Sequence, residues 1–121
     1  EFLASHPKIA YVNYCGLPGD KYHAVAEKYL PNGSCGVVSF GVKGGREAAA
    51  AFMGHLKIAA IETHVADART CCLHPASSTH RQMNDEQLIA AGVQPDLVRM
   101  SCGLEDKNDL IHDIAQALDQ I

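Results

Sequence analysis

The segment from Leu97 to Cys102 constrains the fold most, because it is apolar except for one arginine near its middle and one serine. In a β-strand, successive side chains point to opposite faces of the sheet. One face of this strand is therefore apolar, and the other carries a guanidinium group. The alternation assigns Val98, Met100 and Cys102 to the apolar face, and Leu97, Arg99 and Ser101 to the other.

The guanidinium of Arg99 needs a partner or water. Taking an unpaired charge of this kind out of water costs several kcal/mol. Arg99 must therefore reach solvent, pair with an acidic side chain as a structural ion pair, or bind an anionic ligand. Among ligands, a carboxylate suits the planar fork of donors best. Spacing alone does not separate the structural pair from the ligand.

Strand and helix signals alternate along the rest of the chain, with short turns and no internal repeat. Strands are predicted at 9–15, 35–42, 58–64, 70–73 and 97–102, and helices at 20–30, 46–56, 84–92 and 106–121. This order favours an α+β fold, a small and mostly antiparallel sheet with its helices on one face. The second face, with Arg99 among apolar residues, is better suited to docking on another domain than to lying in water.

Two of the helices carry specific expectations. Asp20 can cap the first predicted helix, whose apolar stripe comprises Val25, Ala26, Tyr29 and Leu30. Asn84 and Gln87 form a capping-box pattern, and Gly92 ends that helix. In the last helix, which begins at Asp106, the apolar residues Leu110, Ile111, Ile114, Leu118 and Ile121 are expected to face inward, and Lys107, Asp109, Asp113 and Asp119 outward.

Composition narrows the class of protein. The chain has 121 residues, of which 47% are hydrophobic, and this suffices to bury about two-thirds of the unfolded surface in one domain. A formal charge of −4 without a basic run argues against binding to nucleic acid or to an anionic membrane. There is no apolar stretch of the roughly 20 residues that a membrane span needs, and no leader peptide is recognisable. We expect a cytoplasmic protein.

The cysteines predict reduced thiols and no metal. Five of them are present, and only the adjacent pair Cys71 and Cys72 is close in sequence. Neither they nor the seven histidines show the spacing of a zinc site. Cys15, Cys35 and Cys102 fall in strand-like runs, where free cysteine usually behaves as a small buried hydrophobe.

An ordered set of motifs places the chain beside a known family. Over essentially its whole length, 1–121, the sequence resembles the carboxy-terminal small domain of the Cys/Met-metabolism family of pyridoxal-phosphate (PLP) enzymes. Within that family it is most similar to the O-acetylhomoserine sulfhydrylases, because residues 63–70 (THVADART) stand where γ-lyases and cystathionine synthases usually carry Ser-Leu-Gly. The motifs are VNYCGL at 12–17, YLPNGSCG at 29–36, VSF at 38–40, KGG at 43–45, HPASSTH at 74–80, QL at 87–88, AGV at 91–93 and RMSCGLE at 99–105.

The resemblance implies a fold-type I transferase whose large PLP-binding domain lies upstream, with the substrate cleft between the two domains. It implies a homotetramer that makes homocysteine from O-acetylhomoserine and sulfide in methionine biosynthesis. Cystathionine γ-synthase and methionine γ-lyase are the nearest alternatives. The family holds PLP on a lysine in a Ser-x-x-Lys context. Lys8 has a serine at that spacing, Ser5, but the resemblance places the PLP lysine in the large domain, outside this chain. We therefore expect no catalytic residue here, no tightly bound PLP and no turnover by this polypeptide alone.

The resemblance also implies site residues. Arg99 matches the arginine that binds the α-carboxylate of the amino-acid substrate. His64 and Val65 fall at positions near the same carboxylate, and Thr79 at a position near the cofactor and the substrate. For His64 a structural hydrogen bond is the alternative, and for Thr79 and the loop histidines 74 and 80 the alternative is turn geometry.

Two other classes of function stay open on sequence alone. A small sheet with one bare face could be a stand-alone regulatory module that binds an amino acid, and calorimetric titration would detect it. The cysteine and histidine content could serve a thiol or metal protein, which elemental analysis would detect.

Overall fold

Strands and helices follow one another in the predicted order, with one additional helix at the N-terminus. The structure is a computed structural model that describes residues 1–121. The elements are α1 (Phe2–Ser5), β1 (Ile9–Asn13), α2 (His23–Tyr29), β2 (Val37–Val42), α3 (Gly45–His55), β3 (Ala60–Ile61), β4 (Cys71–Leu73), the 3₁₀ turn η1 (Pro75–Ser77), α4 (Asp85–Ala90), β5 (Leu97–Ser101) and α5 (Lys107–Asp119).

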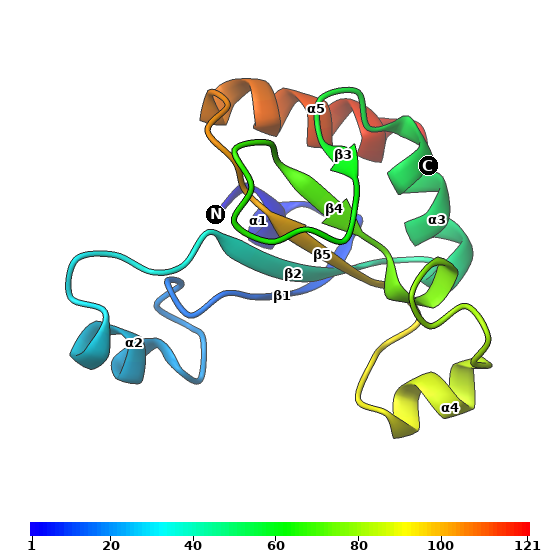
Figure 1. The fold of residues 1–121 in the computed structure, drawn as a ribbon, viewed down its shortest axis with the longest axis horizontal. Helices are drawn as coiled ribbons and strands as arrows, with labels where there is room; N and C mark the ends of the chain where they lie inside the picture. The colour runs from blue at the N-terminus through cyan, green and yellow to red at the C-terminus, as the bar shows by residue number, and fades with distance from the viewer.

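The strands form a single sheet in the order β1-β2-β5-β4-β3. The pairs β1–β2, β2–β5 and β4–β5 are antiparallel, and only the short pair β3–β4 is parallel. The predicted α+β fold with a mostly antiparallel sheet is confirmed (Figure 1). In this order the arginine-bearing strand β5 lies in the middle of the sheet, where its backbone is paired on both sides.

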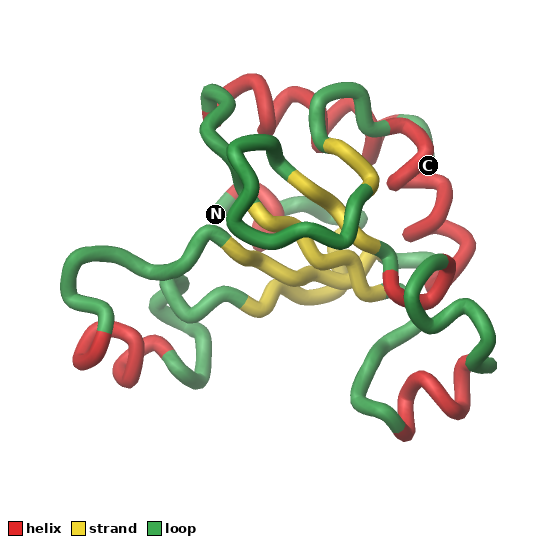
Figure 2. Tube along the Cα trace, in the orientation of Figure 1, coloured by secondary structure: helices red, strands yellow, loops and turns green.

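One face of the sheet carries the hydrophobic core. Phe40 on β2 and Phe52 on α3 are fully buried and meet edge to face with ring centroids 5.8 Å apart. Burying a side chain of this size contributes about 2–3 kcal/mol. Helices α1, α3 and α5 all cover this face (Figure 2). The core comprises Leu3, Ile9, Phe40, Val42, Ala49, Phe52, Met53, Ala59, Cys72, Val98, Met100, Ile114, Ala117 and Leu118.

Helices α2 and α4 project away from the sheet instead of packing on it (Figure 1). The predicted apolar stripe of α2 is therefore wrong as a core-facing surface. Of its four residues only Ala26 is buried, while Val25, Tyr29 and Leu30 are 53%, 68% and 47% exposed. Asp20 is also not the cap, because α2 begins at His23 after Tyr22. The capping box of Asn84 and Gln87 on α4 is confirmed.

Asp113 on α5 is buried, which corrects its assignment to the solvent face. Its carboxylate accepts hydrogen bonds from the backbone amides of Lys57, Ile58 and Ala59 at 2.8, 2.8 and 3.0 Å. Burial raises the pKa of Asp113, but these donors outweigh that effect and hold the pKa below its usual value. A helical pattern predicts that every aspartate faces solvent. Asp113 is buried instead, because the three backbone amides that follow α3 need an acceptor.

The strands are shorter than predicted, and this changes the environment of three cysteines. The β2–β5 pairing ends at Val37 and Ser101, so Cys35 and Cys102 lie beyond the strand ends and are exposed. Cys15 lies beyond the end of β1 and is half-buried. The fully buried cysteines are instead Cys71 and Cys72 on β4. None of the helices combines the length and apolarity needed to cross a membrane.

Candidate functional site

Arg99 lies on the face of the sheet opposite the core. Its neighbours Val98 and Met100 on β5 are buried in the core, so the alternation predicted for this part of the strand is confirmed. Across the sheet, Arg99 pairs with Ser39 of β2 and Leu73 of β4. Directly opposite residues share a face, and neither of these neighbours is acidic. The sheet therefore presents the guanidinium without a carboxylate beside it.

The guanidinium of Arg99 is only partly satisfied. Its Nη2 donates hydrogen bonds to the backbone oxygens of Thr63 at 2.7 Å and His64 at 3.3 Å. Its Nε is buried without a partner, and no ion pair within the chain includes Arg99. A buried donor without a partner costs about 1–3 kcal/mol. The structural ion pair is thus not formed, and the group keeps donors for an anion.

The two carbonyls belong to a segment that crosses the polar face of the sheet between β3 and β4. We call residues 62–70 the carbonyl loop (Figure 2). Inside this loop, Ala66 adopts a left-handed φ of 60°, and its amide donates to the buried hydroxyl of Ser101 at 2.9 Å. The amide of Leu104 donates to the oxygen of Ala68 at 2.9 Å. The loop is thereby held against the end of the strand that bears Arg99.

The far end of the carbonyl loop is held by Glu105. Its carboxylate accepts from the amide of Thr70 at 2.8 Å and from the hydroxyl of Thr70 at 2.7 Å. These bonds, with that of the amide first, lower the pKa of Glu105. A side chain at Gly103 would come within 2.4 Å of the oxygen of Ala68, so the close approach of loop and strand requires glycine there.

The motif at 99–105 therefore has a physical explanation that sequence reasoning missed. Arg99, Ser101, Gly103, Leu104 and Glu105 each contact the carbonyl loop. The signal available in the sequence is the alternate spacing of Arg99, Ser101, Gly103 and Glu105, since every second position after Arg99 is polar or glycine.

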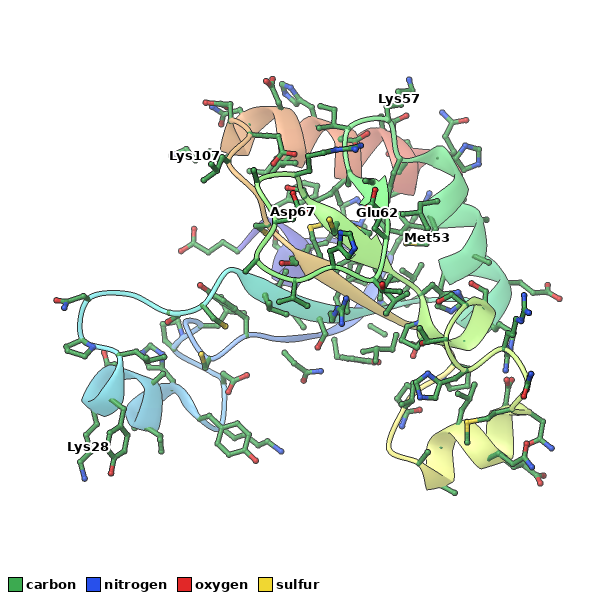
Figure 3. The ribbon with its side chains drawn as sticks, in the orientation of Figure 1. Lys28, Met53, Lys57, Glu62, Asp67 and Lys107 are labelled. Carbon is green, nitrogen blue, oxygen red and sulfur yellow. The ribbon has the colours of Figure 1, made fainter.

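The side chains of His64 and Val65 make no hydrogen bond to Arg99. The imidazole Nδ1 of His64 lies 3.1 Å from a carboxylate oxygen of Glu62 and 3.6 Å from one of Asp67. Figure 3 labels these two acids on the segment in front of β4 and β5. Val65 is 53% exposed. The structure thus brings the backbone of His64, and not its imidazole, to Arg99.

The His-Pro loop lies beyond Leu73, the strand neighbour of Arg99. His74 is buried, with its ring nitrogens 2.8 Å from the hydroxyl of Ser77 and 2.8 Å from the oxygen of Pro95. Burial lowers the pKa of His74. Thr79 is exposed, and its hydroxyl lies 2.9 Å from Nδ1 of His80. Neither Thr79 nor His80 contacts Arg99, and Thr79 stays a prediction of the resemblance.

Two lysines, Lys8 and Lys43, donate their hydrogen bonds to backbone oxygens and not to groups beside Arg99. The ammonium of Lys8 donates to the backbone oxygens of Leu118 and Ile121 on the helix side of the sheet. That of Lys43 donates to the oxygen of Pro7 at 2.7 Å. No group of three or more His, Cys, Asp or Glu side chains could hold a metal ion. The free donors of Arg99 fit a carboxylate.

An apolar cavity lies elsewhere in the domain. It has a volume of about 410 Å³, is mostly apolar, and is bounded by α1, by the ends of β1 and β2, and by the first turns of α5. None of Arg99, His64, Val65 and Thr79 lines it. The chemistry at Arg99 is therefore on an open face of the domain.

Almost the whole chain matches one protein family. The model of the family described as Cys/Met metabolism PLP-dependent enzyme matches residues 1–119. The chain belongs to this family. Its relatives include O-acetyl-L-homoserine sulfhydrylase of Leptospira meyeri, 44% identical over 122 residues, which cover 100% of this chain and 28% of the relative. L-methionine gamma-lyase of Fusobacterium nucleatum is 40% identical over 121 residues, covering 100% of this chain and 30% of the relative.

A solved structure of the Cys/Met family agrees with the fold. The protein is named O-acetylhomoserine (thiol)-lyase, comes from Campylobacter jejuni, and contains N'-pyridoxyl-lysine-5'-monophosphate. It is 37% identical with a TM-score of 0.87, and the match covers 98% of this chain and 28% of that one. The fold is thus that of a domain of a fold-type I PLP-dependent enzyme. The chain spans less than a third of the length of the relatives named here.

Proposed function

We propose that this chain is the small domain that binds the substrate carboxylate in a PLP-dependent enzyme making homocysteine from O-acetylhomoserine and sulfide. The observation that carries the proposal is the guanidinium of Arg99. It lies on the face opposite the core and donates hydrogen bonds to two backbone carbonyls. It also keeps a buried donor without a partner and forms no ion pair within the chain. Among the ligands of a family acting on amino acids, the α-carboxylate matches these donors.

Arg99 would contribute orientation as well as affinity. In such enzymes PLP acts as an electron sink for reactions at the substrate's α-carbon. A guanidinium fixed by the sheet and by Thr63 and His64 holds the carboxylate at a set angle, and so holds the bond at the α-carbon at a set angle. His64 and Val65 would lie beside the carboxylate through their backbone, and Thr79 would face the substrate from the His-Pro loop.

The cofactor would be held by a large domain of the same polypeptide. The match covers 28% of the sulfhydrylase from Leptospira meyeri, so most of that relative lies outside the matched part. The polar face of the sheet is the surface that would meet this domain, since α1, α3 and α5 cover the other face. On this proposal the 121-residue polypeptide alone binds PLP weakly and is inactive, and the complete enzyme is a homo-oligomer.

Methionine γ-lyase is a second candidate, because a relative of that name is 40% identical over the whole chain. The two activities share the carboxylate site and differ in the fate of the γ-substituent. Sulfide adds in the synthase, and elimination occurs in the lyase. Assaying the complete enzyme with sulfide, with cysteine and without a thiol separates the synthase, cystathionine γ-synthase and lyase activities.

The substitution Arg99→Lys tests the role of the guanidinium in the complete enzyme. Lysine keeps the charge and loses the fork, so we expect the KM for O-acetylhomoserine to rise about tenfold or more, from the loss of one charge-assisted hydrogen bond. The visible absorbance of bound PLP should be retained. Unchanged steady-state kinetics would count decisively against the proposal.

A further inference from the structure

The direction of the Arg99 guanidinium depends on the conformation of the carbonyl loop. Both of its hydrogen bonds go to backbone oxygens, those of Thr63 and His64. A backbone carbonyl turns with its peptide plane, so the aim of the guanidinium depends on whatever fixes the peptides after Thr63 and His64. The core cannot fix them, because the loop lies on the open face of the sheet and His64 and Val65 are exposed.

A cluster of charged side chains bridges the two limbs of this loop. His64 lies 3.1 Å from Glu62 on the incoming limb and 3.6 Å from Asp67 on the returning limb. Asp67 also accepts the amide of Arg69 at 3.0 Å, and its pKa is lowered by that bond first and by the charge of His64. The guanidinium of Arg69 lies 3.9 Å from Glu62. One imidazole thus connects the two limbs on either side of the left-handed residue Ala66.

The left-handed residue explains why such a bridge is needed. Ala66 has a φ of 60°, which costs about 1 kcal/mol or more for a residue other than glycine. Ser101 compensates from below by accepting the amide of Ala66 at 2.9 Å. On the exposed side of the loop, the side chains of the cluster span this turn. Separate surface ion pairs contribute little, but here two carboxylates share one imidazole across a strained turn.

We propose that Glu62, His64 and Asp67 form a positioning cluster that holds the carbonyls of Thr63 and His64 in place and so aims Arg99 at the substrate carboxylate. This inference rests on the proposed function of Arg99 and adds a role for three side chains that do not touch the substrate. In this cluster, the imidazole Nδ1 of His64 lies between the two carboxylates. The charged and titratable groups around it are Glu62, Asp67 and Arg69 on the loop, Cys71 on β4, Arg99 on β5 and Glu105 after β5.

The test uses His64→Ala and His64→Gln in the complete enzyme, with kcat and KM measured separately. His64→Ala should raise the KM for O-acetylhomoserine about three- to fivefold, because the aim of Arg99 is lost while the rest of the site remains. The kcat at saturation should change less than the KM. His64→Gln keeps a donor for Glu62 and should recover at least half of the loss in affinity. PLP absorbance should be unchanged in both variants.

The matched control is His112→Ala, which makes the same change at an exposed histidine of α5 without hydrogen bonds to other side chains. It should leave both constants within twofold of the original values. A wild-type KM in His64→Ala would overturn the positioning role, as would an equal loss in His64→Gln. Original kinetics in Arg99→Lys would contradict the proposed function itself. Original kinetics in His64→Ala alone would contradict only the positioning role, so the two results are distinguishable.

Discussion

Two arginines of this domain show how the same side chain can be structural in one region and ready for a ligand in another. Arg46, in the first turn of α3, donates to Asp85 from Nε at 2.9 Å and from Nη2 at 2.6 Å, and also to the backbone oxygens of Ala76 and Met83. Arg99 has two carbonyls, no acid and one buried donor without a partner.

The difference lies in what surrounds each guanidinium. Arg46 on α3 makes hydrogen bonds to both η1 and α4. Its charge is neutralised within the domain by the ion pair with Asp85. Arg99 is flanked on the sheet by Ser39 and Leu73, and its two hydrogen bonds go to backbone oxygens of the carbonyl loop. A cation that forms no ion pair within its own domain retains its attraction for an anion from outside. The comparison therefore predicts that substitution of Arg46 affects stability and substitution of Arg99 affects substrate use.

The largest expected effect is that of Arg99→Ala on catalysis in the complete enzyme. The loss of both orientation and charge should lower kcat/KM by about 10²-fold or more. Folding should be nearly unaffected, because the substitution also removes a buried donor without a partner. Steady-state kinetics and thermal unfolding measure the two effects. A strongly destabilised variant would place Arg99 with Arg46 as a structural residue.

Arg46→Ala should give the opposite result. Removing a guanidinium that serves one carboxylate and two carbonyls should lower the local free energy of unfolding by about 2–3 kcal/mol. Hydrogen exchange should accelerate in η1 and α4, while the KM for the amino acid stays within about twofold. A raised KM without loss of protection would break the distinction between the two regions.

Glu105→Gln tests the anchor of the carbonyl loop and should cost about 1–2 kcal/mol of local stability. Because the pKa of Glu105 is lowered in the folded state, its stabilising effect is present above the unfolded pKa of about 4.3 and is lost as the pH falls through the folded value. Protection of the Thr70 amide, corrected for intrinsic exchange, should therefore fall on acidification below about pH 4. The glutamine variant should show low protection without this pH dependence. A pH-dependent drop that persists in the variant would assign the effect to another carboxyl group.

The smallest effect is expected for Ser101→Ala. It removes the acceptor for the amide of Ala66 and should cost about 1 kcal/mol. The KM for the amino acid should rise by no more than about threefold, since Thr70, Leu104 and Glu105 still hold the loop. A loss as large as that of Arg99→Ala would mean that the serine, and not the arginine, dominates the site.

Much of the fold could be predicted because local signals agree with the packing. The alternation in β5 put Val98 and Met100 in the core, and the capping box placed α4. The burial of Asp113 and the exposure of α2 could not be predicted, because both depend on what lies opposite in space. A helical pattern cannot tell that three backbone amides need an acceptor, or that no core lies beside Val25 and Tyr29.

For the site, the sequence identified Arg99 as the residue to explain but left its partner open. The structure shows no internal ion pair at Arg99, because its hydrogen bonds go to backbone oxygens and no ion pair of the chain includes it. The role of the carbonyl loop could not be predicted, since its contacts to Arg99 are made by backbone oxygens, which every residue has. The assignment of His64, Val65 and Thr79 to the substrate remains a proposal.

The most direct test compares the α-carboxylate substrate with its α-carboxamide, in the complete enzyme and in the Arg99→Ala variant. The measured quantity is the ratio of kcat/KM for O-acetylhomoserine to kcat/KM for O-acetylhomoserine amide. If Arg99 binds the carboxylate, the original enzyme should prefer the acid by about tenfold or more, and the variant should lose most of this preference. An equal preference for the acid in both proteins would contradict the account.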